Sequence, residues 1–230
     1  MLRVLVDLRD RTIQKSRIGM ELRIYALEHG EDKADEVTLA LINRWKERFE
    51  NTENEIDDDI KDMCKNYPII DEMIKVKGLG LMLSAKIVAM VDINRADSVS
   101  AMWRYCGYGV IDGKRERPVK GEKLHYNSRL KTTLYNVAGS FLKCNSSYRL
   151  VYDRAKAYYE ETKADDKEWT KGHIHLASMR KMIKVFLSHL WLVWRTMEQL
   201  ETNKPYVHDV LKHTHYYAPE EFGWTYKLDQ

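Results

Sequence analysis

The sequence predicts an all-α protein, in which a long N-terminal helical hairpin or coiled coil precedes a compact helical domain with a helix-hairpin-helix motif. Two observations support this fold class. The long intervals between the four prolines are rich in Leu, Met, Lys, Glu and Arg, which favour helix. The hydrophobic fraction of 44% suffices for one sizeable core, or for a core and an extended arm.

Charge and cysteine content narrow the setting of the protein. The net charge is only +3, so the distribution of charge carries more information than its sum. No segment approaches the ~18 uncharged apolar residues of a membrane span, and charges from Arg3 onward argue against a signal peptide. Cys64, Cys106 and Cys144 lack metal-ligand spacing, which predicts free, buried thiols in a reducing, cytoplasmic compartment.

Residues 1–67 are predicted to form a helical arm, which begins with one helix over residues 1–29. Apolar residues fall on one stripe of this helix at Ile13, Met20, Ile24 and Leu27. Gly30 is expected to terminate the helix, and residues 31–33 to form a turn.

A second long helix is predicted over residues 35–66, and its apolar residues step by three or four along a narrow seam typical of a coiled coil. The seam consists of Ile42, Trp45, Phe49, Thr52, Ile56, Ile60 and Met63. Acidic residues are expected to cover the outer, solvated faces, where they would repel phosphate: Glu53, Glu55, Asp57, Asp58, Asp59 and Asp62. The two helices form either an antiparallel hairpin or a pair with another subunit, and we expect a homo-oligomer through them.

The break between Tyr67 and Pro68 is the expected boundary of a second domain, residues 68–202. Near its start, Val76-Lys77-Gly78-Leu79-Gly80 lies between two predicted helices. Glycines permit a positive φ and a close backbone approach, and the start of the second helix would aim backbone N–H groups at a phosphate. The residues expected to bind a nucleic-acid backbone here are Lys77, Gly78, Leu79, Gly80, Ser84 and Lys86. The alternative is an ordinary tight corner that needs glycine for its turn alone.

A basic segment follows over residues 109–131, after a short helix that Ser98 is expected to cap. Its glycines and Pro118 predict a loop or a short hairpin. Five cations there are expected to extend the nucleic-acid contact: Lys114, Arg115, Arg117, Lys120 and Lys123. The alternative is an exposed, solubilising loop.

The rest of the chain is predicted to be helical. Apolar spacing indicates helix over residues 128–160 with a break at Asn145, Ser146 and Ser147, and a strongly apolar helix over residues 173–202 as the spine of the core. The tail, residues 203–230, would wrap the surface or pair with a partner. Two His-x-His pairs, at residues 173–175 and 213–215, would suit zinc only on a strand, so no metal or cofactor is expected.

The order of these segments resembles the transposases of the insertion-sequence 110 family. The family shows a coiled coil, a Gly-x-Gly helix-hairpin-helix, an alanine/cysteine-glycine stretch, a basic loop and a leucine-arginine-x-x-leucine-tyrosine helix. The similar segments here are residues 74–80 and 102–108, the glycine- and charge-rich loop through Lys123, and residues 130–135 and 179–183. The resemblance implies DNA binding and a role in DNA recombination.

This chain also departs from the family pattern. The family carries an N-terminal nuclease-like domain with four acidic residues, whereas this chain begins at the coiled coil. The family's nucleophilic serine lies in the loop after the aromatic-glycine stretch, but residues 109–121 contain no serine here. The expected function is therefore binding of duplex DNA, or alternatively structured RNA, without catalysis. The other hypotheses are a recombinase subunit completed by a partner chain and a structural or regulatory protein-interaction module.

Overall fold

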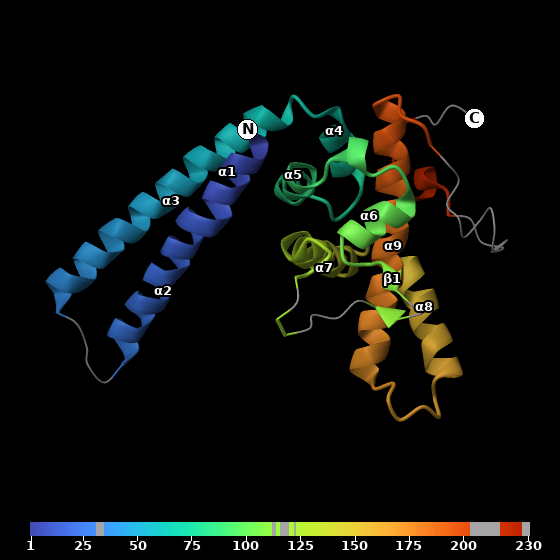
Figure 1. The fold of residues 1–230 in the computed structure, drawn as a ribbon. Helices are drawn as coiled ribbons and strands as arrows, with labels where there is room; N and C mark the ends of the chain where they lie inside the picture. Colours follow the sequence, from blue (N-terminus) through green and yellow to red (C-terminus); the bar gives the residue numbers. More distant parts are fainter. Residues whose placement is uncertain (31–34, 112–113, 116–119, 122, 203–216, 227–230) are drawn as a thin grey trace. The chain divides into compact units, whose positions relative to one another are not determined.

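The fold is all-α, as the sequence predicts. The computed structural model describes residues 1–30, 35–111, 114–115, 120–121, 123–202 and 217–226 (Figure 1). Within these ranges the strands are limited to β1 (Val110–Ile111) and β2 (Lys114–Arg115), which pair antiparallel with Val110 opposite Arg115. The chain divides into two compact units, which we call the arm (Met1–Tyr67) and the C-terminal unit (Pro68–Gln230). None of the described helices is long and apolar enough to cross a membrane.

The arm is a helical hairpin within one chain. Its first side is α1 (Leu2–Leu8), a π-helical turn η1 (Arg9–Ile13) and α2 (Gln14–His29), which continue into one another, while α3 (Glu36–Cys64) runs back alongside them (Figure 1). Asp35 begins α3, because its carboxylate accepts a hydrogen bond from the backbone N–H of Thr38 at 2.8 Å. Of the two pairings left open by the sequence, the structure shows the antiparallel hairpin; the turn predicted at residues 31–33 lies outside the described residues.

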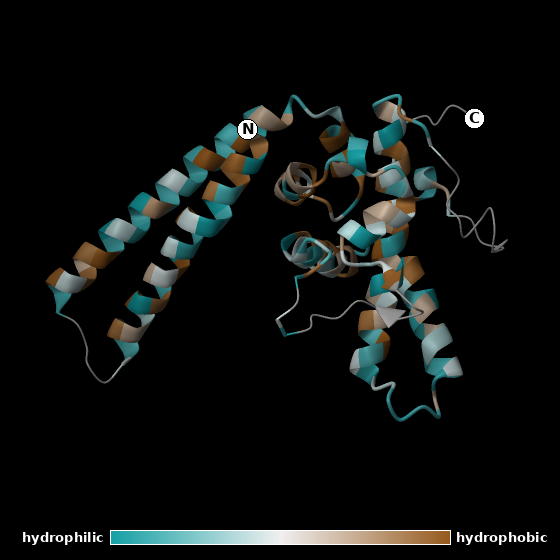
Figure 2. Cartoon of the chain, in the orientation of Figure 1, coloured by the Kyte–Doolittle hydropathy of each residue, from teal (hydrophilic) through white to brown (hydrophobic). Residues whose placement is uncertain are grey.

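Only part of each predicted stripe is buried in the hairpin. Ile24, Ile56 and Ile60 are buried, whereas Trp45 is 45% exposed. Apolar and polar residues alternate along both sides of the arm (Figure 2). Gly30 ends α2 with an ordinary extended conformation, and a Cβ atom there would lie 2.4 Å from the carbonyl oxygen of Ala26. Glycine is therefore required at this position by a close approach and not by a positive φ.

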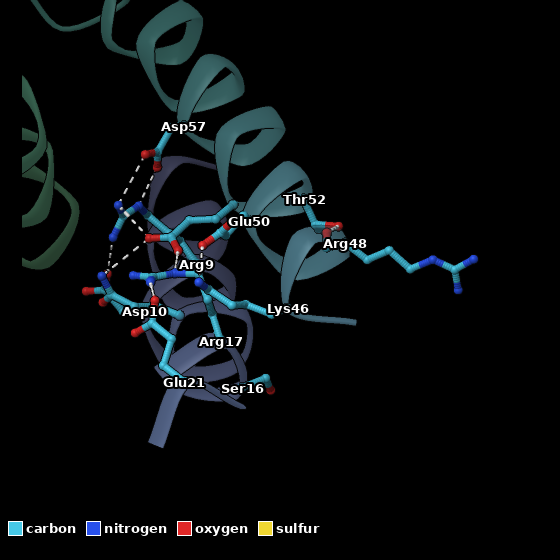
Figure 3. A network of polar contacts seen from close by, with 12 residues as sticks. Arg9, Asp10, Ser16, Arg17, Glu21, Lys46, Arg48, Glu50, Thr52 and Asp57 are labelled. Carbon is cyan, nitrogen blue, oxygen red and sulfur yellow. Dashed lines mark hydrogen bonds and ion pairs between the residues drawn. The ribbon is translucent and has the colours of Figure 1, made fainter. Parts of the chain in front are cut away.

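The acidic run was predicted to lie on the outer faces of the second helix, and for Glu53 and Asp57 this is wrong. Glu53 is only 7% exposed, since two arginines of the other side of the hairpin contact its carboxylate. Arg9 also meets Asp57 across the hairpin (Figure 3). Arg9 contacts Glu53 Oε1 at 2.9 Å and also Asp57, and Arg17 Nε donates to Glu53 Oε2 at 2.7 Å. The hydrogen bond to Asp57 raises the pKa of Arg9, so the guanidinium stays charged.

The C-terminal unit is built around α9 (Lys171–Met197), which the sequence predicts as the spine of the core. Packed with it are α4 (Pro68–Lys75), α5 (Leu81–Met90), α6 (Val99–Tyr105), α7 (Ser128–Lys143) and α8 (Arg149–Thr162), together with the 3-10 turns η2 (Ile93–Arg95) and η3 (Pro219–Phe222). The buried residues of α9 include Met182, Ile183, Phe186, Leu187, Leu190, Trp191 and Trp194. The predicted break between α7 and α8 is confirmed, with Asn145 at a φ of 52°.

Residues 217–226 pack onto the C-terminal unit through a buried chain of hydrogen bonds. Trp224 Nε1 donates to the Tyr148 hydroxyl at 2.8 Å, and that hydroxyl lies 2.7 Å from His189 Nδ1. His189 Nε2 lies 2.9 Å from the carbonyl oxygen of Tyr217, which only accepts, so the proton resides on Nε2 and Nδ1 accepts from Tyr148. Burial lowers the pKa of His189 to about 4, so the ring is neutral at pH 7. This part of the predicted tail contacts its own chain.

Candidate nucleic-acid interface

The predicted phosphate-binding residues form the turn that joins α4 to α5. The Leu79 N–H donates to the Val76 carbonyl at 3.0 Å, which closes the turn. Leu79 is 5% exposed, so its side chain anchors the turn in the core. Lys77, before Leu79 in the turn, and Gly80, after it, are both exposed. The turn therefore presents one cation and one glycine to solvent.

Gly78 is required by the fold. Its φ is +97°, and a Cβ atom there would lie 3.1 Å from Phe141 Cδ1 in α7. The hydroxyl of Ser140 also donates to the Gly78 carbonyl at 2.6 Å. A tight corner against α7 is thus a sufficient explanation for this glycine.

Neither backbone conformation nor packing explains the glycine at position 80. It occupies the N-cap of α5 with φ −94° and ψ 165°, a conformation open to any residue, and a Cβ atom there would meet nothing within 4 Å. Glycine also supplies no side chain to accept from the first N–H groups of the helix, and α5 shows no side-chain cap. The start of α5 is therefore sterically open and carries the positive end of the helix dipole.

The two predicted contact residues inside α5 differ from each other. Ser84 is fully buried, and its hydroxyl donates to the Gly80 carbonyl at 3.1 Å. The prediction that Ser84 binds phosphate is thus wrong, because its hydroxyl is turned back onto its own helix. Lys86 is half-buried and interacts within the protein.

The basic segment contains the β1–β2 ladder, and beyond it residues 120, 121 and 123 are described. Lys114 and Arg115 form β2, and only their backbone is described. Arg117 lies outside the described residues. Lys120 and Lys123 are exposed. Of the five cations predicted to contact nucleic acid here, Lys120 and Lys123 thus lie at solvent-facing positions.

Both ends of the basic segment are held by hydrogen bonds. At its start, Arg180 Nη2 donates to the carbonyls of Tyr108 and Gly109, each at 2.6 Å. Near its end, the Asn127 N–H donates to the Tyr105 carbonyl at 2.9 Å, and the Asn127 side chain caps α7. Arg180 could not be identified from the sequence, because its contact joins residues 71 positions apart. In the sequence, the only indication of a role for Arg180 is its place in the segment over residues 179–183.

The turn and the basic segment are not gathered into one compact site. The turn contacts α7 near Ser140, whereas the basic segment leads into the other end of α7 at Asn127. At 1.5 Å per residue, these two points on the helix are about 20 Å apart. The predicted contact residues thus border α7 at both ends.

The structure also shows the surroundings of His173, His175 and the three cysteines. His173 and His175 lie on α9, where residues two apart point to different faces. Among the described residues no group of three His, Cys, Asp or Glu side chains could hold a metal; His213 and His215 lie outside them. The three cysteines are free thiols, but Cys144 is exposed, which corrects the prediction that all three are buried.

Comparison with family models, with curated proteins and with solved structures gives no match for this chain.

Proposed function

We propose that this protein binds duplex DNA through the sugar-phosphate backbone, with the start of α5 and Lys77 as the main contact and the basic segment as a second one. The observation that carries the proposal is Gly80. A glycine that neither its φ nor its packing requires leaves the start of α5 open, and a phosphate can approach the N–H groups there. Lys77 in the same turn adds a charge-assisted contact.

The spacing of the two contacts supports a duplex as the ligand. Phosphates along one strand are about 3.4 Å apart along the helix axis, so about 20 Å corresponds to roughly six of them. Lys120 and Lys123, which precede the far end of α7 in the chain, would then contact the same duplex. Contacts to phosphate position a protein without reading sequence, so we expect little sequence preference.

The proposed activity is binding in a reducing, cytoplasmic setting, without strand cleavage by this chain. The loop over residues 109–121 lacks the serine that the resembling transposases use, and free thiols fit a reducing compartment. Incubation of the protein with supercoiled DNA and magnesium should leave the DNA uncut. Cleavage would instead favour a recombinase role.

Salt should weaken the binding in a defined way. If Lys77, Lys120 and Lys123 each neutralise a phosphate, the plot of log Kobs against log salt concentration should have a slope of about −3 or steeper. Fluorescence anisotropy of a labelled duplex between low and moderate salt measures this slope. A salt-independent affinity, or no binding at low salt, would contradict the proposal.

Gly80→Asp should separate binding from folding. Aspartate is at least as good an N-cap as glycine, so the melting temperature should stay the same or rise slightly. The carboxylate would repel a phosphate at the start of α5, and we expect an approximately tenfold loss of duplex affinity, or about 1.4 kcal/mol.

Gly80→Asn is the matched control, because it caps the helix with a side chain of the same shape and no charge. It should lose less affinity than Gly80→Asp. Gly78 is unsuitable for this test, since any side chain there strains the backbone and meets Phe141. Equal affinity of the Asp variant and the unchanged protein would refute the proposed contact.

A further inference from the structure

A hollow of about 700 Å³ lies beside α7, next to the turn between α4 and α5. Its lining includes Ser140, whose hydroxyl donates to the Gly78 carbonyl at 2.6 Å, so the hollow and the turn adjoin. The volume lies within the range of small-molecule and nucleotide sites in proteins. The proposed phosphate contact does not use this hollow.

Gly139 opens the wall of the hollow on α7. It lies in the interior of the helix, where glycine costs roughly 0.5–1 kcal/mol relative to alanine. A Cβ atom there would meet nothing within 4 Å, so packing does not require the glycine. Gly139 therefore resembles Gly80, because at each position the chain leaves open space where a side chain would fit.

The side chains along this wall suit a nucleotide. Tyr135 is 50% exposed, and it lies one turn before Gly139, while Lys143 lies one turn after. Asn136 also lines the hollow. An exposed aromatic ring stacks on a base, an amide can bond to a base edge, and a lysine can contact phosphate.

The lining of the hollow also includes a histidine from α9, His175, whose ring is held by a hydrogen bond. His175 Nδ1 lies 2.7 Å from the Tyr152 hydroxyl, and the two rings meet edge to face with centroids 5.6 Å apart. Because Nδ1 is engaged, Nε2 is the ring nitrogen left to a ligand. The described residues that line the hollow include no carboxylate that would repel a phosphate.

We propose that this hollow binds one unpaired nucleotide of a DNA strand whose backbone is held at the start of α5. The base would stack on Tyr135 above Gly139, with Asn136 and His175 at its edges and Lys143 near its phosphate. The proposal rests on the proposed function, because the strand is brought there by the turn. A base that is already unpaired enters at the lowest cost, since no stacking or pairing must be broken.

The test compares two duplexes of the same sequence, one fully paired and one with a single unpaired 2-aminopurine. The unchanged protein should bind the bulged duplex about tenfold more tightly and quench the 2-aminopurine fluorescence by stacking. Tyr135→Leu should remove both the preference and the quenching, while Tyr135→Phe should keep them. Gly139→Leu should remove them by filling the hollow, and it should leave the melting temperature unchanged or higher.

The outcomes separate the two proposals. Affinity for the paired duplex should be unchanged in the Tyr135 and Gly139 variants, because the backbone contact remains. Equal binding of both duplexes by the unchanged protein would refute the nucleotide site alone, whereas no binding of the paired duplex at low salt would refute the proposed function. Binding of free dAMP without a preference for the bulge, or tighter binding of the same bulge in RNA, would also overturn this assignment.

Discussion

Acidification from pH 6.5 to pH 4 should lower the free energy of unfolding of the C-terminal unit by about 3 kcal/mol through His189 alone. The unfolded chain takes up this proton near pH 6.5, but the folded protein does so only near pH 4, because the ring is buried. Between these values the unfolded state binds more protons, so stability falls as the pH falls. Charging the ring would also remove the acceptor at Nδ1 that Tyr148 uses.

Denaturant unfolding at a series of pH values, followed by tryptophan fluorescence, measures this loss. His189→Gln is the control, since its amide keeps a donor for the Tyr217 carbonyl and an acceptor for Tyr148 but cannot be charged. The variant is expected to be less stable at pH 7 and to have a flatter profile between pH 6.5 and pH 4. Parallel profiles for the two proteins would show that His189 does not carry the effect.

The helices could be predicted from the sequence because their apolar residues recur at helical spacing. The break at Asn145 and the cap at Ser98 are local features, and the structure confirms both. The hairpin of the arm was one of two alternatives, since a stripe such as Ile56 and Ile60 indicates a buried face but does not identify its partner.

The errors concern polar residues at buried positions. Glu53 appears in an acidic run, and only the position of Arg9 and Arg17 across the hairpin explains why it is buried. Ser84 follows the glycine turn as a phosphate-binding serine would, but its direction from the helix axis points it inward. In these cases the sequence gives the type of each residue, but it does not give the direction in which the side chain points.

The candidate site could be predicted from the sequence only in part. The sequence identifies Lys77 and Gly80 because they lie within four consecutive residues of the chain. It could not identify the contact from Arg180 to the Gly109 carbonyl, or the hollow between Tyr135 and His175, because these features join distant segments. Only the structure distinguishes Gly78, which packing requires, from Gly80, which it does not.

Arg9→Met should destabilise the arm by about 3 kcal/mol, at the lower end of the range for breaking a buried ion pair. The Arg9 side chain is 12% exposed and contacts the carboxylates of Asp10 and Asp57 (Figure 3), as well as that of Glu53. Among these contacts, removal of Arg9 leaves Glu53 paired with Arg17 and leaves Asp57 without a cation. Hydrogen exchange of the full chain should therefore show faster exchange in α1, α2 and α3, with the C-terminal unit unchanged.

The matched control lies two residues away in the same π-helical turn. Arg11 is 64% exposed and approaches Asp7 only at 3.9 Å, so Arg11→Met should change stability by less than about 0.5 kcal/mol. Equal effects of the two substitutions would mean that loss of positive charge in the arm, rather than the buried contact, causes the change. Adding Asp57→Leu to Arg9→Met should restore part of the lost stability, because an apolar pair can replace a buried ion pair, whereas one buried charge without its partner destabilises. A double variant less stable than Arg9→Met would instead assign Asp57 a separate structural role.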